Sequence, residues 1–297
     1  MRRVRNAPQL ALVATVIFVA LMVLPSMSAR AVPGVTTTTQ PAGSPFSSAL
    51  LNYLRSRQDT VSVAIHNNAT QQTWSLNSSF RYHASSVAKV NLMAAYLYKL
   101  QVAKQLMSAV DKVKMSDMII YSNNVNADYF YIKVGDCGGL TLFNALIPMT
   151  STTPGCMYKH ITGWGTTNTT VLDQIALLEL FTKPNAILTD ASRRHGLSLM
   201  TRISTGGSWG VSVGPTPGTK VAFKNGWSPL DSYQNWEINS VGWIQGSHRD
   251  YEIAILTSHN PNYAYGVSTV NTIAQSIWNT MGAPRFYVPV TSTTLAK

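Results

Sequence analysis

The chain has 297 residues, of which 45% are hydrophobic and 12% are charged, and its formal net charge is +11 at pH 7. This composition is typical of a globular protein and excludes a disordered chain. The basic residues form no run with interleaved aromatic side chains, so we expect no nucleic-acid partner.

The N-terminus has the pattern of a secretory signal. A basic stretch, MRRVRN, precedes an uncharged apolar run over 10–24, and ARA at 29–31 supplies small residues before a cleavage site. We predict that residues 1–31 are a signal peptide. Its removal takes away four arginines and no acid, leaving a secreted or cell-wall-associated protein with a net charge of +7. The alternative is an uncleaved membrane anchor, although the apolar run is short for a span of about 20 residues.

Residues 32–45 are rich in Thr, Pro, Gly and Ser, which predicts a linker. A single domain is predicted over 46–285, followed by a tail over 286–297 to which we assign no role. The domain begins with a helix over 46–57 that Ser44 caps, with Pro45 in its first turn.

The remaining predicted elements change type along the chain. Alternating residues predict a hairpin of strands, and apolar periodicity then predicts helices, of which the first is mostly apolar and therefore central. The last third predicts strands and a closing helix. These elements cover 60–67 and 70–77, then 85–101, 104–120 and 169–183, and finally 219–227, 236–245, 251–258 and 266–282. We therefore expect an α+β fold, in which N- and C-terminal strands share an antiparallel sheet flanked by a helical subdomain.

Cys137 and Cys156 are the only cysteines of the chain. Outside the cytoplasm two cysteines predict one disulfide. The alternative is a pair of separate buried thiols.

Ser86 and Lys89 form the first candidate chemical motif. They are three positions apart, so on a helix their side chains share one face. A lysine inside an apolar helix loses solvation, which lowers its pKa and makes it a usable base. The alternatives are a chance spacing and a Lys89 side chain that extends to the surface.

Two further motifs follow. Ser122 and Asn124 precede a helical segment, where a hydroxyl and an amide could act on a substrate or could merely cap the helix. Lys224 and Gly226 lie in a predicted strand, where the glycine allows a ligand to approach the backbone and the lysine offers positive charge. Lys224 could instead be an edge-strand residue that prevents aggregation.

The order S-x-x-K, S-x-N, K-x-G resembles the signature of class A β-lactamases and penicillin-binding proteins. The resemblance spans about residues 46–283. It implies that Ser86 is the nucleophile and that Lys89 accepts its proton. Ser122, with Lys224 beside it, would pass a proton to the departing nitrogen.

The resemblance also implies substrate-binding residues. Asn124 would bind the side-chain amide of the substrate, and Lys224 and Asn225 would receive its carboxylate at the strand that contains Gly226. The backbone N–H groups of Ser86 and Trp227 would form the oxyanion hole.

Three departures qualify the resemblance. Asn123 and Asn225 replace the usual Asp and the usual Thr or Ser, and the spacing between the first two motifs is short. Residues 137–172 contain no Asp or Glu, where class A enzymes have the glutamate that activates the deacylating water. His160 is the one alternative base in this stretch. Deacylation is therefore expected to be slow.

We interpret the chain as a monomeric exported serine hydrolase that acts on a β-lactam or a peptidoglycan stem peptide, without cofactor or metal. One alternative is a peptidase-like penicillin-binding protein that cleaves D-alanyl-D-alanine, and another is a non-catalytic module that binds wall peptides. GGSWG at 206–210 matches a hydrolase nucleophile elbow, but a Gly- and Pro-rich stretch follows it rather than a helix. The six histidines show no metal-binding spacing.

Overall fold

The computed structural model describes residues 43–204, 209–230, 235–246 and 248–282. The predicted signal peptide, most of the linker and the C-terminal tail lie outside the described residues. In the ranges given above, no helix is both long enough and apolar enough to cross a membrane.

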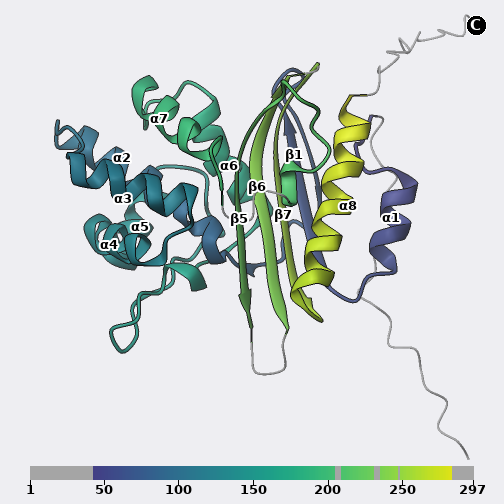
Figure 1. Ribbon diagram of the computed structural model, residues 1–297, viewed down its shortest axis with the longest axis horizontal. Coiled ribbons are helices and arrows are strands. Elements are labelled where there is room, and N and C mark those ends of the chain that lie inside the picture. Colours follow the sequence, from purple (N-terminus) through teal and green to yellow (C-terminus); the bar gives the residue numbers. More distant parts are fainter. Residues whose placement is uncertain (1–42, 205–208, 231–234, 247, 283–297) are drawn as a thin grey trace, which may run out of the picture. The chain divides into compact units, whose positions relative to one another are not determined.

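A five-stranded antiparallel sheet runs through the described domain (Figure 1). Its strand order, β2-β1-β7-β6-β5, places strands from both ends of the domain side by side. Val63 of β1, for example, pairs with Ile255 of β7. The strands are β1 (Thr60–Asn67), β2 (Gln72–Leu76), β5 (Lys220–Pro229), β6 (Trp236–Gly246) and β7 (Arg249–Asn260), and a separate pair is formed by β3 (Tyr82–His83) and β4 (Asn168–Thr169). The predicted α+β fold is confirmed.

Helices cover both faces of the sheet (Figure 1). On one face α8 packs on β6 and β7, with α1 beside it; on the other face α6 packs on β1 and β7, and the helical subdomain extends from there. The helices are α1 (Ser48–Arg55), α2 (Ala88–Val102), α3 (Ala109–Ile120), α4 (Asn124–Val134), α5 (Asp136–Asn144), α6 (Val171–Thr182), α7 (Asp190–Met200) and α8 (Tyr263–Met281), with short 3-10 turns η1 (Ser85–Val87), η2 (Trp164–Thr166) and η3 (Gly210–Ser212).

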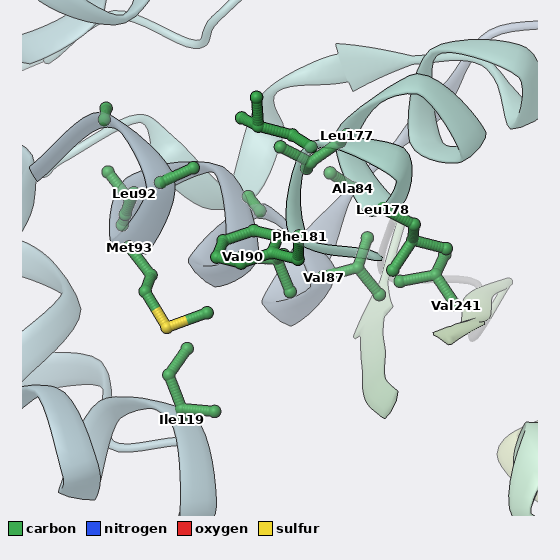
Figure 2. Packing of buried hydrophobic residues seen from close by; sticks show 14 of the residues in the cluster. Ala84, Val87, Val90, Leu92, Met93, Ile119, Leu177, Leu178, Phe181 and Val241 are labelled. Atoms are coloured by element: carbon green, nitrogen blue, oxygen red, sulfur yellow. The ribbon is translucent and has the colours of Figure 1, made fainter. Parts of the chain in front are cut away.

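The central helix α2 is buried over residues 88–97. Figure 2 shows Val87 of η1 and Val90 of α2 close to Phe181 of α6. Burying an aliphatic or aromatic side chain of this size contributes about 1.5–3 kcal/mol. The packing therefore fixes α2 and the η1 turn that precedes it, which is the segment that carries the first predicted motif.

Several boundaries differ from those predicted. Ser47 rather than Ser44 caps α1, because its side chain accepts a hydrogen bond from the N–H of Leu50, and Pro45 precedes the helix. Ser108 caps α3 in the same way, so this helix starts at 109 instead of 104. Helices α5 and α7 were not predicted. Adjacent glycines in α5 and charged residues in α7 interrupt the apolar periodicity that would indicate a helix.

The nucleophile-elbow interpretation of 206–210 is not supported. Ser208 itself lies outside the described residues, but Gly210 begins the short turn η3, and strand β5 rather than a helix follows. The sheet is also antiparallel, whereas an α/β-hydrolase needs a parallel one.

Candidate active site

The η1 turn separates the two neighbouring serines. Ser85 has a positive φ of 49° and is buried, and its Oγ lies 2.8 Å from the Oγ of Ser228 on β5. Ser86 is half-buried, and the Nζ of Lys89 donates to its Oγ at 2.9 Å. The hydroxyl of Ser86 is therefore the one that meets both a basic side chain and the surface.

Gly226 determines how closely β5 approaches this turn. A Cβ at this position would lie 2.8 Å from the backbone nitrogens of both Ser86 and Val87. Contacts that short with backbone atoms cannot be relieved by a rotamer change, so only glycine allows the approach. The sequence predicted that Gly226 makes room for a ligand, and the structure shows that it makes room for the turn that carries Ser86.

The side chain of Lys89 is completely buried, with an exposed fraction of 0%. Besides Ser86, its Nζ contacts the carbonyl oxygen of Ser122 at 2.6 Å, the Oγ of Ser122 at 3.1 Å and the Oδ1 of Asn124 at 2.7 Å. Burial lowers the pKa of Lys89 to about 7, while the negative charge of Asp128 acts in the opposite direction. A large fraction of Lys89 is therefore neutral at pH 7.

These contacts direct the lone pair of the neutral amine. The carbonyl oxygens of Ser122 and Asn124 can only accept, so they take the two N–H donors of a neutral Lys89. The lone pair is left for a hydroxyl hydrogen, either that of Ser86 or that of Ser122. This is the geometry of a general base for one serine and of a proton relay to the other.

Ser122 lies between the two lysines. It follows α3 with a positive φ of 55°, and Asn123 then caps α4 by accepting from the N–H of Asn126 at 2.9 Å. The Nζ of Lys224 donates to the Oγ of Ser122 at 3.0 Å. Lys224 is fully buried, and its burial together with the charge of Lys89 lowers its pKa well below the ordinary value.

Five predicted site residues thus meet in one cluster, namely Ser86, Lys89, Ser122, Asn124 and Lys224. The Oγ of Ser86, the Nζ of Lys89, the Oγ of Ser122 and the Nζ of Lys224 follow one another at 2.9, 3.1 and 3.0 Å. We call these five residues the Ser86 cluster. Asn124 is exposed, and in the described part of the chain its Nδ2 has no hydrogen-bond partner, so its amide stays accessible.

Asn225 and Trp227 do not direct their side chains toward the cluster. The Nδ2 of Asn225 donates to the carbonyl oxygen of Trp209, and its Oδ1 accepts from Ser240. The ring of Trp227 packs against Tyr263 of α8 with centroids 6.0 Å apart. Alternation along β5 explains this, because Lys224 and Gly226 occupy the opposite face. The predicted carboxylate contact of the Asn225 side chain is therefore not supported.

Trp164 was not predicted as a site residue, yet its ring centroid lies 4.7 Å from the Nζ of Lys89. Asp128 of α4 holds the loop in place, because its Oδ1 accepts from the Nε1 of Trp164 at 2.7 Å and also from the hydroxyl of Thr162. The expected disulfide between Cys137 and Cys156 ties the same loop to the start of α5. In the sequence, the glycines on both sides of Trp164 are the one feature that could have indicated a functional position for it.

The described residues place no carboxylate in hydrogen-bonding contact with Ser86 or Lys89. His160 lies at the exposed tip of a turn closed by Tyr158 and Ile161, and it has no contact with the Ser86 cluster. Within the described part of the chain, no group of three His, Cys, Asp or Glu residues could hold a metal ion.

No family model matches the chain, and a search of curated proteins gives no match. Solved structures do match. The TLA-1 extended-spectrum β-lactamase is 20% identical over 79% of this chain and 97% of that chain, with a TM-score of 0.70. A class A β-lactamase from Bacteroides cellulosilyticus is 15% identical over 80% of this chain and 97% of that chain, with a TM-score of 0.71.

This protein has a class A β-lactamase-like fold. A β-lactamase from Chitinophaga pinensis adds a third match, 17% identical over 78% of this chain and 97% of that chain, with a TM-score of 0.69. The coverage agrees with the extent of the resemblance in the sequence. At these identities the comparisons establish the fold and not the reaction.

Proposed function

We propose that this protein is a serine hydrolase that forms an acyl-enzyme through Ser86 on a β-lactam or on a D-alanyl-D-alanine-like peptide. The contact of a buried Lys89 with the Ser86 hydroxyl carries the proposal. Burial keeps much of Lys89 neutral near pH 7, and its two N–H donors are already engaged, so its lone pair is available to Ser86.

Acylation follows from these contacts. The Oγ of Ser86 attacks the carbonyl carbon as its proton moves to the Nζ of Lys89, and backbone N–H groups of Ser86 and Trp227 stabilise the oxyanion. When the carbon–nitrogen bond breaks, the hydroxyl of Ser122 gives its proton to the leaving nitrogen and regains one from Lys89. The product is a Ser86 ester; the amine leaves with the C-terminal residue of a peptide, whereas in an opened β-lactam it stays attached to the acyl group.

Among the described residues, deacylation has no evident base. Hydrolysis of the ester needs a group that activates water, and such a group contributes roughly 10²- to 10⁴-fold. On the loop that passes Lys89 the nearby side chain is the apolar Trp164, and residues 137–172 contain no Asp or Glu. We infer that the acyl-enzyme is long-lived, which favours a penicillin-binding or peptidase-like role over efficient β-lactam hydrolysis.

An extracytoplasmic setting is part of the proposal. The disulfide between Cys137 and Cys156 is compatible with an oxidising compartment, and the sequence begins with a signal-like segment. A peptidoglycan stem peptide is the natural counterpart of a β-lactam in that location. A module that binds such peptides without turnover would use the same fold, and the Lys89–Ser86 contact argues against it.

Labelling with a fluorescent penicillin tests the proposal. We expect covalent labelling of the wild type, loss of labelling in Ser86→Ala, and retained labelling in the matched variant Ser85→Ala, because Ser85 bonds to Ser228 instead of Lys89. Equal labelling of the wild type and Ser86→Ala would contradict the assignment of the nucleophile. A wild type that takes no label from penicillins or from D-alanyl-D-alanine thioesters would favour the non-covalent module.

A further inference from the structure

Exposed apolar side chains are concentrated in the helical subdomain. Among the described residues, twelve of the fourteen large apolar side chains that are exposed lie between residues 102 and 161, in and around α3, α4 and α5. Single exposed apolar residues are ordinary on a protein surface, but their concentration in one part of the chain indicates an interaction surface. The highest exposed fraction, 96%, belongs to Leu106 in the turn between α2 and α3.

Helix α3 has apolar residues on both of its faces. Asp111, Met115 and Met118 are buried, so they define the face that packs on the domain. Val110 and Val113 lie on the other face, with exposed fractions of 59% and 62%. A surface helix ordinarily presents polar side chains to solvent, so this outer face needs a partner to explain it.

A tight turn adds two more apolar residues to this face. The N–H of Gln105 bonds to the carbonyl oxygen of Leu100 at 2.9 Å, and Ser108 caps α3, which brings the end of α2 close to the start of α3. Val102 and Leu106, on either side of Gln105, are both exposed. We call the four residues Val102, Leu106, Val110 and Val113 the α3 patch.

The exposed charge beside the α3 patch is positive. Over residues 99–116 the one acid is Asp111, which is buried and bonded to the Nζ of Lys133 at 3.0 Å. Lys104 and Lys112 are exposed, and neither forms an ion pair with an acid of the described ranges. The patch therefore presents apolar side chains and unpaired lysines without an exposed carboxylate.

The turn after α7 contributes a further cation. Burial lowers the pKa of His195, and the charges of Arg202 and Lys112 lower it further, which shows that both cations lie within electrostatic reach of this histidine. The one acid of α7 is Asp190, and it forms ion pairs with two arginines of its own helix. Helix α7 thus adds no unpaired negative charge to this side of the subdomain.

We propose that the α3 patch docks the domain on the surface of a membrane that contains anionic lipid. The apolar side chains would enter the boundary between the headgroups and the acyl chains, and Lys104 and Lys112 would contact the phosphates. The uncharged apolar run over 10–24 precedes the domain, and as a signal or as an anchor it brings the chain to a membrane. The proposal does not depend on the reaction proposed for Ser86.

A second copy of the chain is a poorer occupant of the patch. In a symmetric dimer the same surface meets itself, so Lys104 and Lys112 of one copy would face the same lysines of the other. No exposed acid lies over residues 99–116 to offset that repulsion. An anionic lipid surface matches both the apolar and the charged parts of the patch.

Fluorescence of a dye placed beside the patch tests the proposal. Both cysteines of the chain form the disulfide, so Ala109→Cys supplies the one free thiol for an environment-sensitive dye. Ala109 is exposed next to Val110, and labelling it leaves the four patch residues in place. A dye at this position reports on the patch even where residues 10–24 hold the full chain on a vesicle.

We expect a saturable blue shift when the labelled full chain meets vesicles of equal parts phosphatidylglycerol and phosphatidylcholine. The shift should be much smaller with phosphatidylcholine alone, because the lysines then have no anionic surface to contact. The matched control is a dye at Gln275→Cys, an exposed position of α8 on the other face of the sheet (Figure 1), and this dye should stay in water.

Substitutions in the labelled protein separate the two contributions. At a fixed vesicle concentration, Leu106→Ser should lower the ratio of bilayer-buried to water-exposed dye about tenfold, because a leucine no longer enters the bilayer. Leu142→Ser removes another exposed leucine, on α5, and should leave the ratio unchanged. Lys104→Gln and Lys112→Gln should each lower the ratio about fivefold, and high salt should weaken docking of the wild type in the same direction.

Several results would overturn the proposal. They are the absence of a blue shift at position 109, an equal shift at position 275, equal shifts with both kinds of vesicle, and equal ratios in Leu106→Ser and Leu142→Ser. A shift that grows with protein concentration in the absence of vesicles would show that a second copy covers the patch, and it would overturn the proposal too.

Discussion

The pH dependence of acylation follows from the burial of Lys89. Burial lowers its pKa to about 7. A solvated lysine, with a pKa of about 10.4, is neutral in roughly 0.04% of molecules at pH 7, whereas a pKa of about 7 makes half of the molecules neutral, so burial provides on the order of 10³ times more base. Because protonated Lys89 cannot accept the proton of Ser86, the acylation rate should rise about tenfold per pH unit below 7 and level off above it.

The assay is the second-order rate of labelling by a fluorescent penicillin, measured between pH 5 and 9. The variant Asp128→Asn gives a second test of the Lys89 pKa. Its amide oxygen still accepts from Thr162 and Trp164, but the negative charge that raises the pKa of Lys89 is gone. The inflection of this variant should therefore move to lower pH. A rate that does not change over this range, or that is still rising steeply at pH 9, would refute the role of Lys89 as the base.

Three further predictions concern the packing around the site and the stability of the domain. In Gly226→Ala the added Cβ would lie 2.8 Å from the nitrogen of Ser86. We expect labelling to slow on the order of 10²-fold by misplacement of the nucleophile, and an unchanged rate would show that the close approach does not matter. Replacing both Cys137 and Cys156 by serine opens a loop closed by residues 19 apart. Chain entropy predicts a loss of about 3 kcal/mol in urea unfolding, and equal midpoints for both proteins would contradict it. Burial raises the pKa of Glu237 to about 7. The folded state therefore holds this proton where an unfolded glutamate with a pKa of ~4.3 does not, and stability falls as the pH rises between these values. Glu237→Gln should remove up to ~3 kcal/mol of this fall in stability. Unfolding of both proteins at pH 5 and at pH 8 measures the difference. An identical pH dependence in the two proteins would contradict the raised pKa of Glu237.

The sequence predicted the parts of the site that rest on local spacing or on the order of motifs. Ser86 and Lys89 are one helical turn apart, so their contact follows from periodicity alone. The meeting of Ser122 with Lys224 joins residues far apart in the chain, and only the resemblance to a known family anticipated it. The fold was predictable for a related reason, since strands at both ends of the domain have few ways to pair other than in one sheet.

Other features could not be inferred in this way. Strand alternation places Asn225 on the opposite face of β5 from Lys224, and the role implied by the family resemblance does not take this into account. Trp164 reaches Lys89 through a loop that Asp128 and a disulfide hold in place, and no periodic pattern reports such contacts. Glu252 is fully buried on β7, where it resembles an ordinary strand residue until the tertiary structure is known.

Intact-protein mass spectrometry after mixing with benzylpenicillin, followed over time, tests the central claim most directly. We predict a single adduct that forms on the wild type, persists because no carboxylate of the described residues bonds to Ser86 or Lys89, and is absent from Ser86→Ala. Accumulation of hydrolysed benzylpenicillin without a detectable adduct would contradict slow deacylation. Absence of both adduct and product would remove β-lactams as substrates of the Ser86 cluster.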